Sequence, residues 1–151
     1  MAEIRISETA GGIAARLKRD IEASVVLITE TLQDKHVVHA CIGLELPQRL
    51  RHELPLGYPV CEHTVAMGFP LIVDDAFNHP LLTGNPAVTE LGIGSYAGAP
   101  LFRIDGQAGG AICAMQPHIH RWSAAQIEII LEASRSAEKV LFQQFITMRC
   151  S

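Results

Sequence analysis

The stretch that decides the fold is Ser95-Tyr-Ala-Gly-Ala-Pro-Leu-Phe-Arg-Ile-Asp-Gly-Gln-Ala-Gly-Gly-Ala-Ile-Cys-Ala-Met-Gln116. Two β-rich runs, residues 95–103 and 107–116, flank an Asp-Gly pair, which favours a tight hairpin turn. Because side chains alternate across a strand, Tyr96 and Gly98 should share one face, and Cys113 and Met115 should share a face of the next strand. The pattern predicts two adjacent antiparallel strands, and their small residues leave room on the sheet.

A long helix is predicted beyond this hairpin. Ser123, with Gln126 three residues later, forms a capping-box pattern that opens a helix over residues 123–149. At 1.5 Å per residue this helix would be ~40 Å long, whereas a five-residue strand spans only ~17 Å. Its end should therefore overhang the sheet. The apolar Phe142, Phe145 and Ile146 predict a homodimer in which this helix pairs with the same helix of a second copy.

The sequence before the hairpin completes an α+β pattern. A first helix is expected from Ser7 to about Ile21, then a hairpin of residues 24–31 and 36–44, and then a proline-rich loop over 47–59 with one helical turn around 48–52. Short elements follow: a helix at 61–67, a strand at 70–74 and a helix at 86–91. This order predicts an antiparallel sheet of five or six strands, with the terminal helices on one face and the middle segment covering a pocket on the other.

Composition narrows the class of protein. The chain has 151 residues, 48% of them hydrophobic and 19% charged, which favours a single globular domain over residues 1–151. The net charge of −4 comes from 12 basic and 16 acidic residues, and the basic residues are mostly scattered, which argues against a nucleic-acid partner. No apolar run approaches the ~20 residues that cross a membrane, and the N-terminus lacks a signal-peptide pattern. We therefore expect a cytoplasmic protein that does not bind membranes.

Six short strings in the middle and C-terminal parts point to a known family. They are Pro59-Val-Cys-Glu-His-Thr-Val-Ala-Met67, Pro70-Leu-Ile-Val-Asp-Asp75, Asn85-Pro-Ala-Val88, Ser95-Tyr-Ala-Gly-Ala-Pro-Leu101, Gly109-Gly-Ala-Ile-Cys113 and Arg121-Trp-Ser-Ala-Ala-Gln126. In order and spacing they resemble the GAF domains of bacteria. The resemblance implies dimerisation through terminal helices and a pocket beside the sheet. Members bind cyclic nucleotides, bilins, haem or small metabolites, and others serve only as dimerising connectors.

The sequence departs from the better-defined GAF subclasses. Bilin-attaching members carry a Cys-His pair late in the domain, whereas here Cys61-Glu62-His63 lies early and Cys113 precedes Ala114. The signature residues of cyclic-nucleotide-binding members are absent. Free methionine sulfoxide reductases share the fold, but their cysteine pattern does not align with Cys61 and Cys113. We therefore expect no cofactor and a colourless protein.

The candidate ligand-binding residues lie on the face bearing Tyr96 and on the segment from 61 to 79 that should cover it. This segment mixes apolar anchors with polar groups, as a site that orients a small molecule requires. The candidates are Cys61, His63, Thr64, Asp75, Phe77, His79, Tyr96, Cys113 and Met115.

Several of these residues have a structural interpretation as well. Residues two apart on a helix point about 200° away from each other, so Cys61 and His63 should not meet. Asp75 and Asn78 suit turn hydrogen bonds to their own backbone, and His118-Ile-His120 is too small a group to predict a metal site.

Three functions remain open at this point. The first is a sensory module that binds a small molecule and signals through its dimer or a partner protein. The second is a dimerising or docking module without a ligand. The third is a thiol enzyme that uses Cys61, with Cys113 as its resolving thiol. The pattern favours the first, which is not an enzyme.

Overall fold

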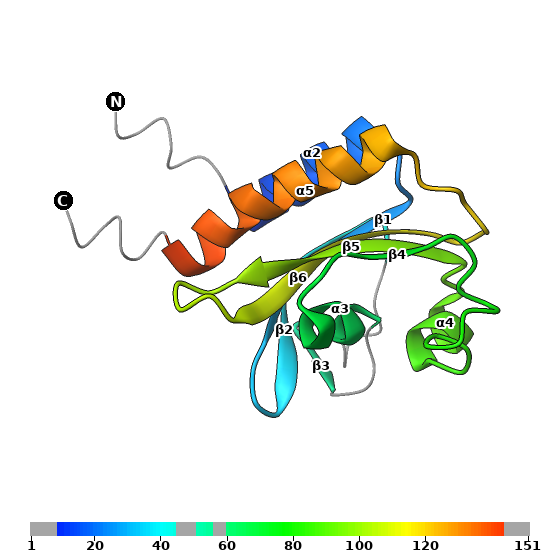
Figure 1. Ribbon diagram of the computed structural model, residues 1–151, viewed down its shortest axis with the longest axis horizontal. Coiled ribbons are helices and arrows are strands. Elements are labelled where there is room, and N and C mark those ends of the chain that lie inside the picture. The colour runs from blue at the N-terminus through cyan, green and yellow to red at the C-terminus, as the bar shows by residue number, and fades with distance from the viewer. Residues whose placement is uncertain (1–8, 45–50, 56–59, 144–151) are drawn as a thin grey trace.

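Six strands form one antiparallel sheet in the order β3-β2-β1-β6-β5-β4 in the computed structural model (Figure 1). The structure describes residues 9–44, 51–55 and 60–143. Among them lie the strands β1 Val25–Thr31, β2 Lys35–Ile42, β3 Glu53–Pro55, β4 Leu71–Val73, β5 Ser95–Phe102 and β6 Ala108–Gln116. The sheet confirms the predicted α+β class and its antiparallel pairing.

The central hairpin of β5 and β6 follows the predicted alternation. Tyr96 pairs with Met115, Gly98 pairs with Cys113, and Cys113 also lies opposite Leu27 of β1. Tyr96, Cys113 and Met115 belong to the apolar core on one face of the sheet. The residues between them, such as Ala97 and Ile112, belong to the core on the other face.

The two long helices cover one face of the sheet. Helices α2 (Ala10–Ile21) and α5 (Ala124–Glu138) lie side by side above the strands (Figure 1). Both predicted residues of the capping box act as expected, since Ser123 Oγ accepts from Gln126 N at 3.0 Å and Ser123 N donates to Gln126 Oε1 at 2.9 Å. None of the described helices is long and apolar enough to cross a membrane.

Two short helices lie beyond the opposite face. Helix α3 (Cys61–Met67) packs on β5 and β6, and α4 (Pro86–Leu91) follows a connector rich in turns (Figure 1). Asn85 caps α4 by accepting from Ala87 N at 2.8 Å, and each of the two helices ends at a glycine in the left-handed region. Both helices have the bounds predicted from the sequence. The apolar core that contains Tyr96, Cys113 and Met115 fills the space beneath them.

The structure corrects three details of the prediction. Thr9, and not Ser7, caps α2, because its side chain accepts from Gly12 N at 3.0 Å. The predicted loop contains β3, which pairs with β2. A helical turn was expected around residues 48–52; residues 48–50 lie outside the described residues, and residues 51–52 form a bend.

The final helix also differs from the prediction. It continues into a π-helical segment η2 (Lys139–Gln143), whose wider turn changes the direction of the side chains. Phe142 is half-buried and packs against its own core and beneath Arg103, whose guanidinium carbon lies 5.1 Å from the ring centre; its expected contact with a second copy stays a prediction. The expected contacts of Phe145 and Ile146 lie outside the described residues.

Candidate functional site: a thiol-lined cavity under the sheet

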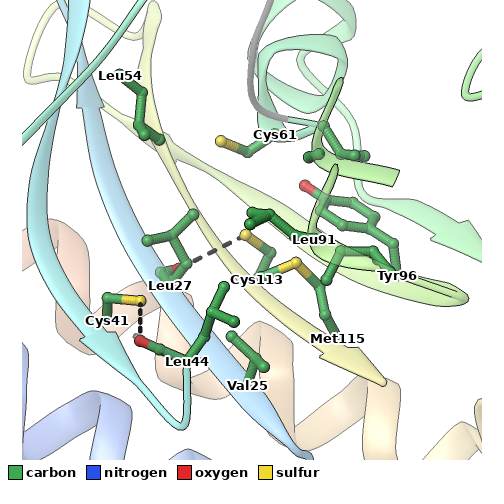
Figure 2. A pocket seen from close by; sticks show the side chains of 13 residues that line it. Val25, Leu27, Cys41, Leu44, Leu54, Cys61, Leu91, Tyr96, Cys113 and Met115 are labelled. Atoms are coloured by element: carbon green, nitrogen blue, oxygen red, sulfur yellow. Dashed lines mark hydrogen bonds between the residues drawn. The ribbon is translucent and has the colours of Figure 1, made fainter. Parts of the chain in front are cut away.

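A small apolar cavity lies between the sheet and the short helices. Its volume is about 30 Å³, which is room for one or two water-sized molecules. Figure 2 shows side chains from β1, β2, β5, β6 and α3 converging on it. The lining carries no charged side chain among the described residues, and its polar atoms are the thiols and one phenol. The residues are Val25, Leu27, Cys41, Leu44, Leu54, Val60, Cys61, Ala87, Leu91, Ile93, Tyr96, Cys113 and Met115.

Buried thiols and hydroxyls form a connected chain along this cavity. Thr64 Oγ1 lies 2.7 Å from Tyr96 Oη, and Thr29 Oγ1 lies 3.5 Å from Cys61 Sγ. Between these ends lies Cys113, whose Sγ donates to the Leu27 carbonyl oxygen at 3.6 Å and which is close enough to Tyr96 and Cys61 to shift the pKa of each. We call Thr29, Cys61, Cys113, Tyr96 and Thr64 the thiol–hydroxyl chain. All five side chains are buried, and the contacts within the thiol–hydroxyl chain give their polar atoms partners in an apolar core.

The thiol–hydroxyl chain separates the acidities of its members. The hydrogen bond from the Cys113 thiol lowers the pKa of Cys61, and the Thr29 hydroxyl acts in the same direction against the opposing effect of burial. Donating that bond to Cys61 raises the pKa of Cys113 well above its usual range, and burial raises it further. Burial also raises the pKa of Tyr96. Cys61 is therefore the member that ionises most readily.

The local sequence explains why these groups meet. Cys61 and Thr64 are three residues apart on α3, so both face the sheet. Gly98 lies beneath the Tyr96 ring, and a Cβ atom there would be 2.3 Å from Tyr96 Oη. Cross-strand pairing places Gly98 beside Cys113. The glycine thus provides the space in which the phenol reaches the thiol.

The structure brings together five of the nine predicted site residues. Cys61, Tyr96, Cys113 and Met115 line the cavity, and Thr64 holds the Tyr96 hydroxyl. His63 is half-buried on another side of α3 and does not line the cavity, as the helical spacing predicts.

The three predicted residues of the connector also lie away from the lining. Asp75 accepts from Phe77 N at 3.1 Å and from Asn78 Nδ2 at 2.9 Å, which is the turn arrangement considered for it. The Phe77 side chain is 45% exposed. His79 Nδ1 accepts from Leu81 N at 3.2 Å. In this structure their observed contacts are those of a folded turn.

A buried histidine near the cavity was missed by sequence reasoning. His36 on β2 is fully buried, and its Nε2 atom lies 2.9 Å from Glu62 Oε2 while its Nδ1 atom lies 3.1 Å from Thr31 Oγ1. This contact ties α3 to the first hairpin. No local signal distinguishes His36 from His39 on the same strand, because the burial depends on α3, which comes later in the chain.

The site offers no metal centre in the part of the chain that the structure describes. No group of three or more His, Cys, Asp or Glu side chains is arranged to hold a metal ion there. His118 and His120 have rings 6.4 Å apart, and His120 Nε2 lies 3.1 Å from Gln126 Oε1. Both histidines contact nearby residues of the same polypeptide.

The sheet order, the paired terminal helices and the short helices over the cavity define an α+β fold. The chain belongs to the GAF domain family, whose model matches residues 5–141. No curated protein matches the sequence.

Solved structures show the same architecture. The GAF domain of an Acinetobacter phosphoenolpyruvate-protein phosphotransferase has a TM-score of 0.72 at 14% identity, covering 91% of this chain and 86% of that chain. A free methionine-R-sulfoxide reductase from Neisseria meningitidis, solved with its substrate, has a TM-score of 0.71 at 22% identity, covering 91% and 81%. The type II enzyme of Thermoplasma acidophilum has a TM-score of 0.69 at 15% identity, covering 85% and 86%. At these identities the likeness shows the fold alone, which is shared by GAF domains and enzymes.

Proposed function

We propose that this GAF domain is a regulatory module that binds a small, uncharged, mainly apolar molecule in the cavity beside Tyr96. The observation that supports this proposal is the lining, which is apolar apart from the thiols and the Tyr96 hydroxyl. A carboxylate or phosphate buried there would lose its hydration without meeting a cation among the described residues, at a cost of several kcal/mol. An apolar ligand with one hydrogen-bonding group suits the cavity better.

The size of the cavity limits this ligand. About 30 Å³ receives only a few heavy atoms, so a larger ligand has to displace lining side chains. Leu91, at the end of α4, is half-buried and lines the cavity, which makes it a wall that can be moved at low cost. We infer that binding shifts α4 and that this movement is the signal passed to a dimer partner or another protein.

Thermal stability tests the ligand proposal. A ligand present at 100 times its Kd stabilises the folded state by ~2.7 kcal/mol, which raises the Tm of a domain of this size by roughly 5 to 10 °C. We expect a panel of small uncharged metabolites to contain such a compound. Leu91→Trp should remove the shift by filling the cavity, whereas Leu81→Trp, on the exposed connector, should keep it. A shift that survives Leu91→Trp would place the ligand elsewhere.

The small cavity volume favours a second candidate, a dimerising or docking module without a ligand. Side chains of the protein already fill most of the space under α3 and α4. Native mass spectrometry of protein isolated from its own host separates the two candidates, because it reports retained small molecules and oligomeric state together. A dimer with no retained molecule, combined with an empty thermal screen, would favour the docking module.

A further inference from the structure

Two cysteines from distant parts of the chain share one buried site. Cys61 begins α3 and Cys113 lies in the middle of β6, and both side chains point into the same cavity (Figure 2). We propose that Cys61 and Cys113 form a dithiol site that a hydroperoxide oxidises to a disulfide between α3 and β6. This inference depends on the position of the two thiols and not on the ligand proposed above.

The surrounding strands position both sulfur atoms. Cys61 Sγ lies 3.5 Å from Thr29 Oγ1, and Cys113 Sγ lies 3.6 Å from the Leu27 carbonyl oxygen. Thr29 and Leu27 are two residues apart on β1, and Leu27 pairs with Cys113 while Thr29 pairs with Ala111. The Cys61 sulfur therefore lies at the Thr29 position of this face and the Cys113 sulfur at the Leu27 position, and both line one cavity.

The hydrogen bonds assign different roles to the two thiols. The contacts of Cys61 with Cys113 and with Thr29 lower its pKa, which favours its thiolate. Cys113 keeps its proton, which it can donate either to Cys61 or to the Leu27 carbonyl. Because the thiolate is the nucleophile in thiol chemistry, Cys61 reacts first and Cys113 resolves.

The cavity suits a small oxidant. Its volume of about 30 Å³ fits hydrogen peroxide, which has two heavy atoms, without displacing any lining side chain. The Cys61 sulfur attacks one peroxide oxygen, the O–O bond breaks, and the other oxygen leaves with the thiol proton as water, or as an alcohol from an organic hydroperoxide. Cys61 becomes a sulfenic acid.

The second step closes the disulfide. The Cys113 sulfur attacks the Cys61 sulfur, the S–O bond breaks, and the hydroxyl group leaves as water with the Cys113 proton. In total two electrons pass from the two sulfurs to the peroxide. The new bond ties α3 covalently to β6 and removes the contact between Cys61 and Thr29, so oxidation changes the wall of the cavity.

Counting free thiols in the whole 151-residue chain tests the site. The chain has four cysteines, so the reduced protein should take up four alkylating groups after denaturation. After treatment with hydrogen peroxide in the native state it should take up two, and a peptide map should show Cys61 joined to Cys113. Dithiothreitol should restore all four. We expect the bond to form at least 10-fold faster in native protein than in urea, because folding brings the thiols together.

The other cysteines provide the controls. Cys41 lines the same cavity, but its thiol donates to the Leu44 carbonyl at 3.5 Å, so Cys41→Ser should still form the bond between Cys61 and Cys113. Cys61→Ser should not form it. In Cys113→Ala, Cys61 should stop at the sulfenic acid and react with dimedone. A bond to Cys41 or Cys150, equal rates in urea, or no dimedone adduct in Cys113→Ala would each overturn the proposal.

Discussion

Gly98 shows how one missing side chain shapes the candidate site. The Tyr96 ring lies over Gly98 on the same face of β5, and its hydroxyl reaches Thr64 at 2.7 Å. A Cβ atom at position 98 would lie 2.3 Å from Tyr96 Oη and 2.6 Å from Cζ, closer than real contacts allow. The ring therefore has to move if any side chain is added there.

We predict that Gly98→Ala destabilises the fold by about 1–3 kcal/mol, the usual cost of overpacking a core. Urea unfolding measures this change. In a Tyr96→Ala background the same substitution should cost much less, because the ring that it meets is gone. Equal costs in the two backgrounds would show that the ring does not occupy the space above Gly98.

At the scale of elements, Gln126 joins the two terminal helices. Its Oε1 atom completes the capping box of α5, while its Nε2 atom donates to the Ile21 carbonyl at the end of α2 at 3.0 Å. One side chain therefore satisfies the first turn of one helix and the last turn of the other. The cap could be predicted from the sequence. The hydrogen bond from Gln126 to the Ile21 carbonyl could not, because 105 residues separate the two partners.

Substitutions at the cap separate these two roles. Ser123→Ala removes the cap alone and should cost about 1 kcal/mol of unfolding free energy. Gln126→Ala removes the cap partner, the tie to α2 and the contact with His120, so it should cost at least about 1 kcal/mol more. Gln126→Glu keeps the acceptor but loses the donor, and hydrogen exchange should then show faster opening of the last turn of α2. If Gln126→Ala costs no more than Ser123→Ala, the tie contributes nothing.

Elements with strong local signals were predictable from the sequence. Helix α4 begins at Pro86 after the Asn85 cap and ends before a glycine, so its bounds could be read directly. Strand β3 could not, because it is three residues long and exists through its pairing with β2. The π-helical end of α5 has no local sequence signal either, and it redirects Phe142 onto its own core.

The candidate site was predictable only in part for the same reason. Alternation correctly placed Cys113 and Met115 on one face of β6, but the register that puts them on the same face as Tyr96 is a property of the strand pairing. Ligand-binding residues were also predicted on the polar connector around His79, yet these groups form hydrogen bonds within their own turn. Thr29 became part of the site only through its distance to Cys61, which lies 32 residues later. Long-range contacts of this kind depend on the packing of α3, which no local pattern encodes.

At the scale of the whole molecule, the buried acids link stability to pH. In the folded state Cys113 and Tyr96 have pKa values well above their usual range, mainly because of the Cys61 contact and of burial, respectively. In the unfolded chain a thiol ionises near 8.5 and a tyrosine near 10. Above those values the unfolded chain has released protons that the folded state still holds. Unfolding then releases protons, and a rise in pH favours it.

We predict that the free energy of unfolding of the reduced protein falls as the pH rises above about 8.5, and falls more steeply above about 10. Each group contributes a slope that approaches 1.4 kcal/mol per pH unit above its unfolded pKa. Cys61 acts in the opposite direction because its pKa is lowered, but its effect on the slope is confined to pH values below about 8.5, where the unfolded thiol still holds its proton. Urea unfolding between pH 7 and 10.5 measures the slope. Cys113→Ala should flatten this slope from about pH 8.5 upward, and Tyr96→Phe should flatten it only above about pH 10. A slope that is unchanged in both variants would mean that the fold holds neither group in its protonated form.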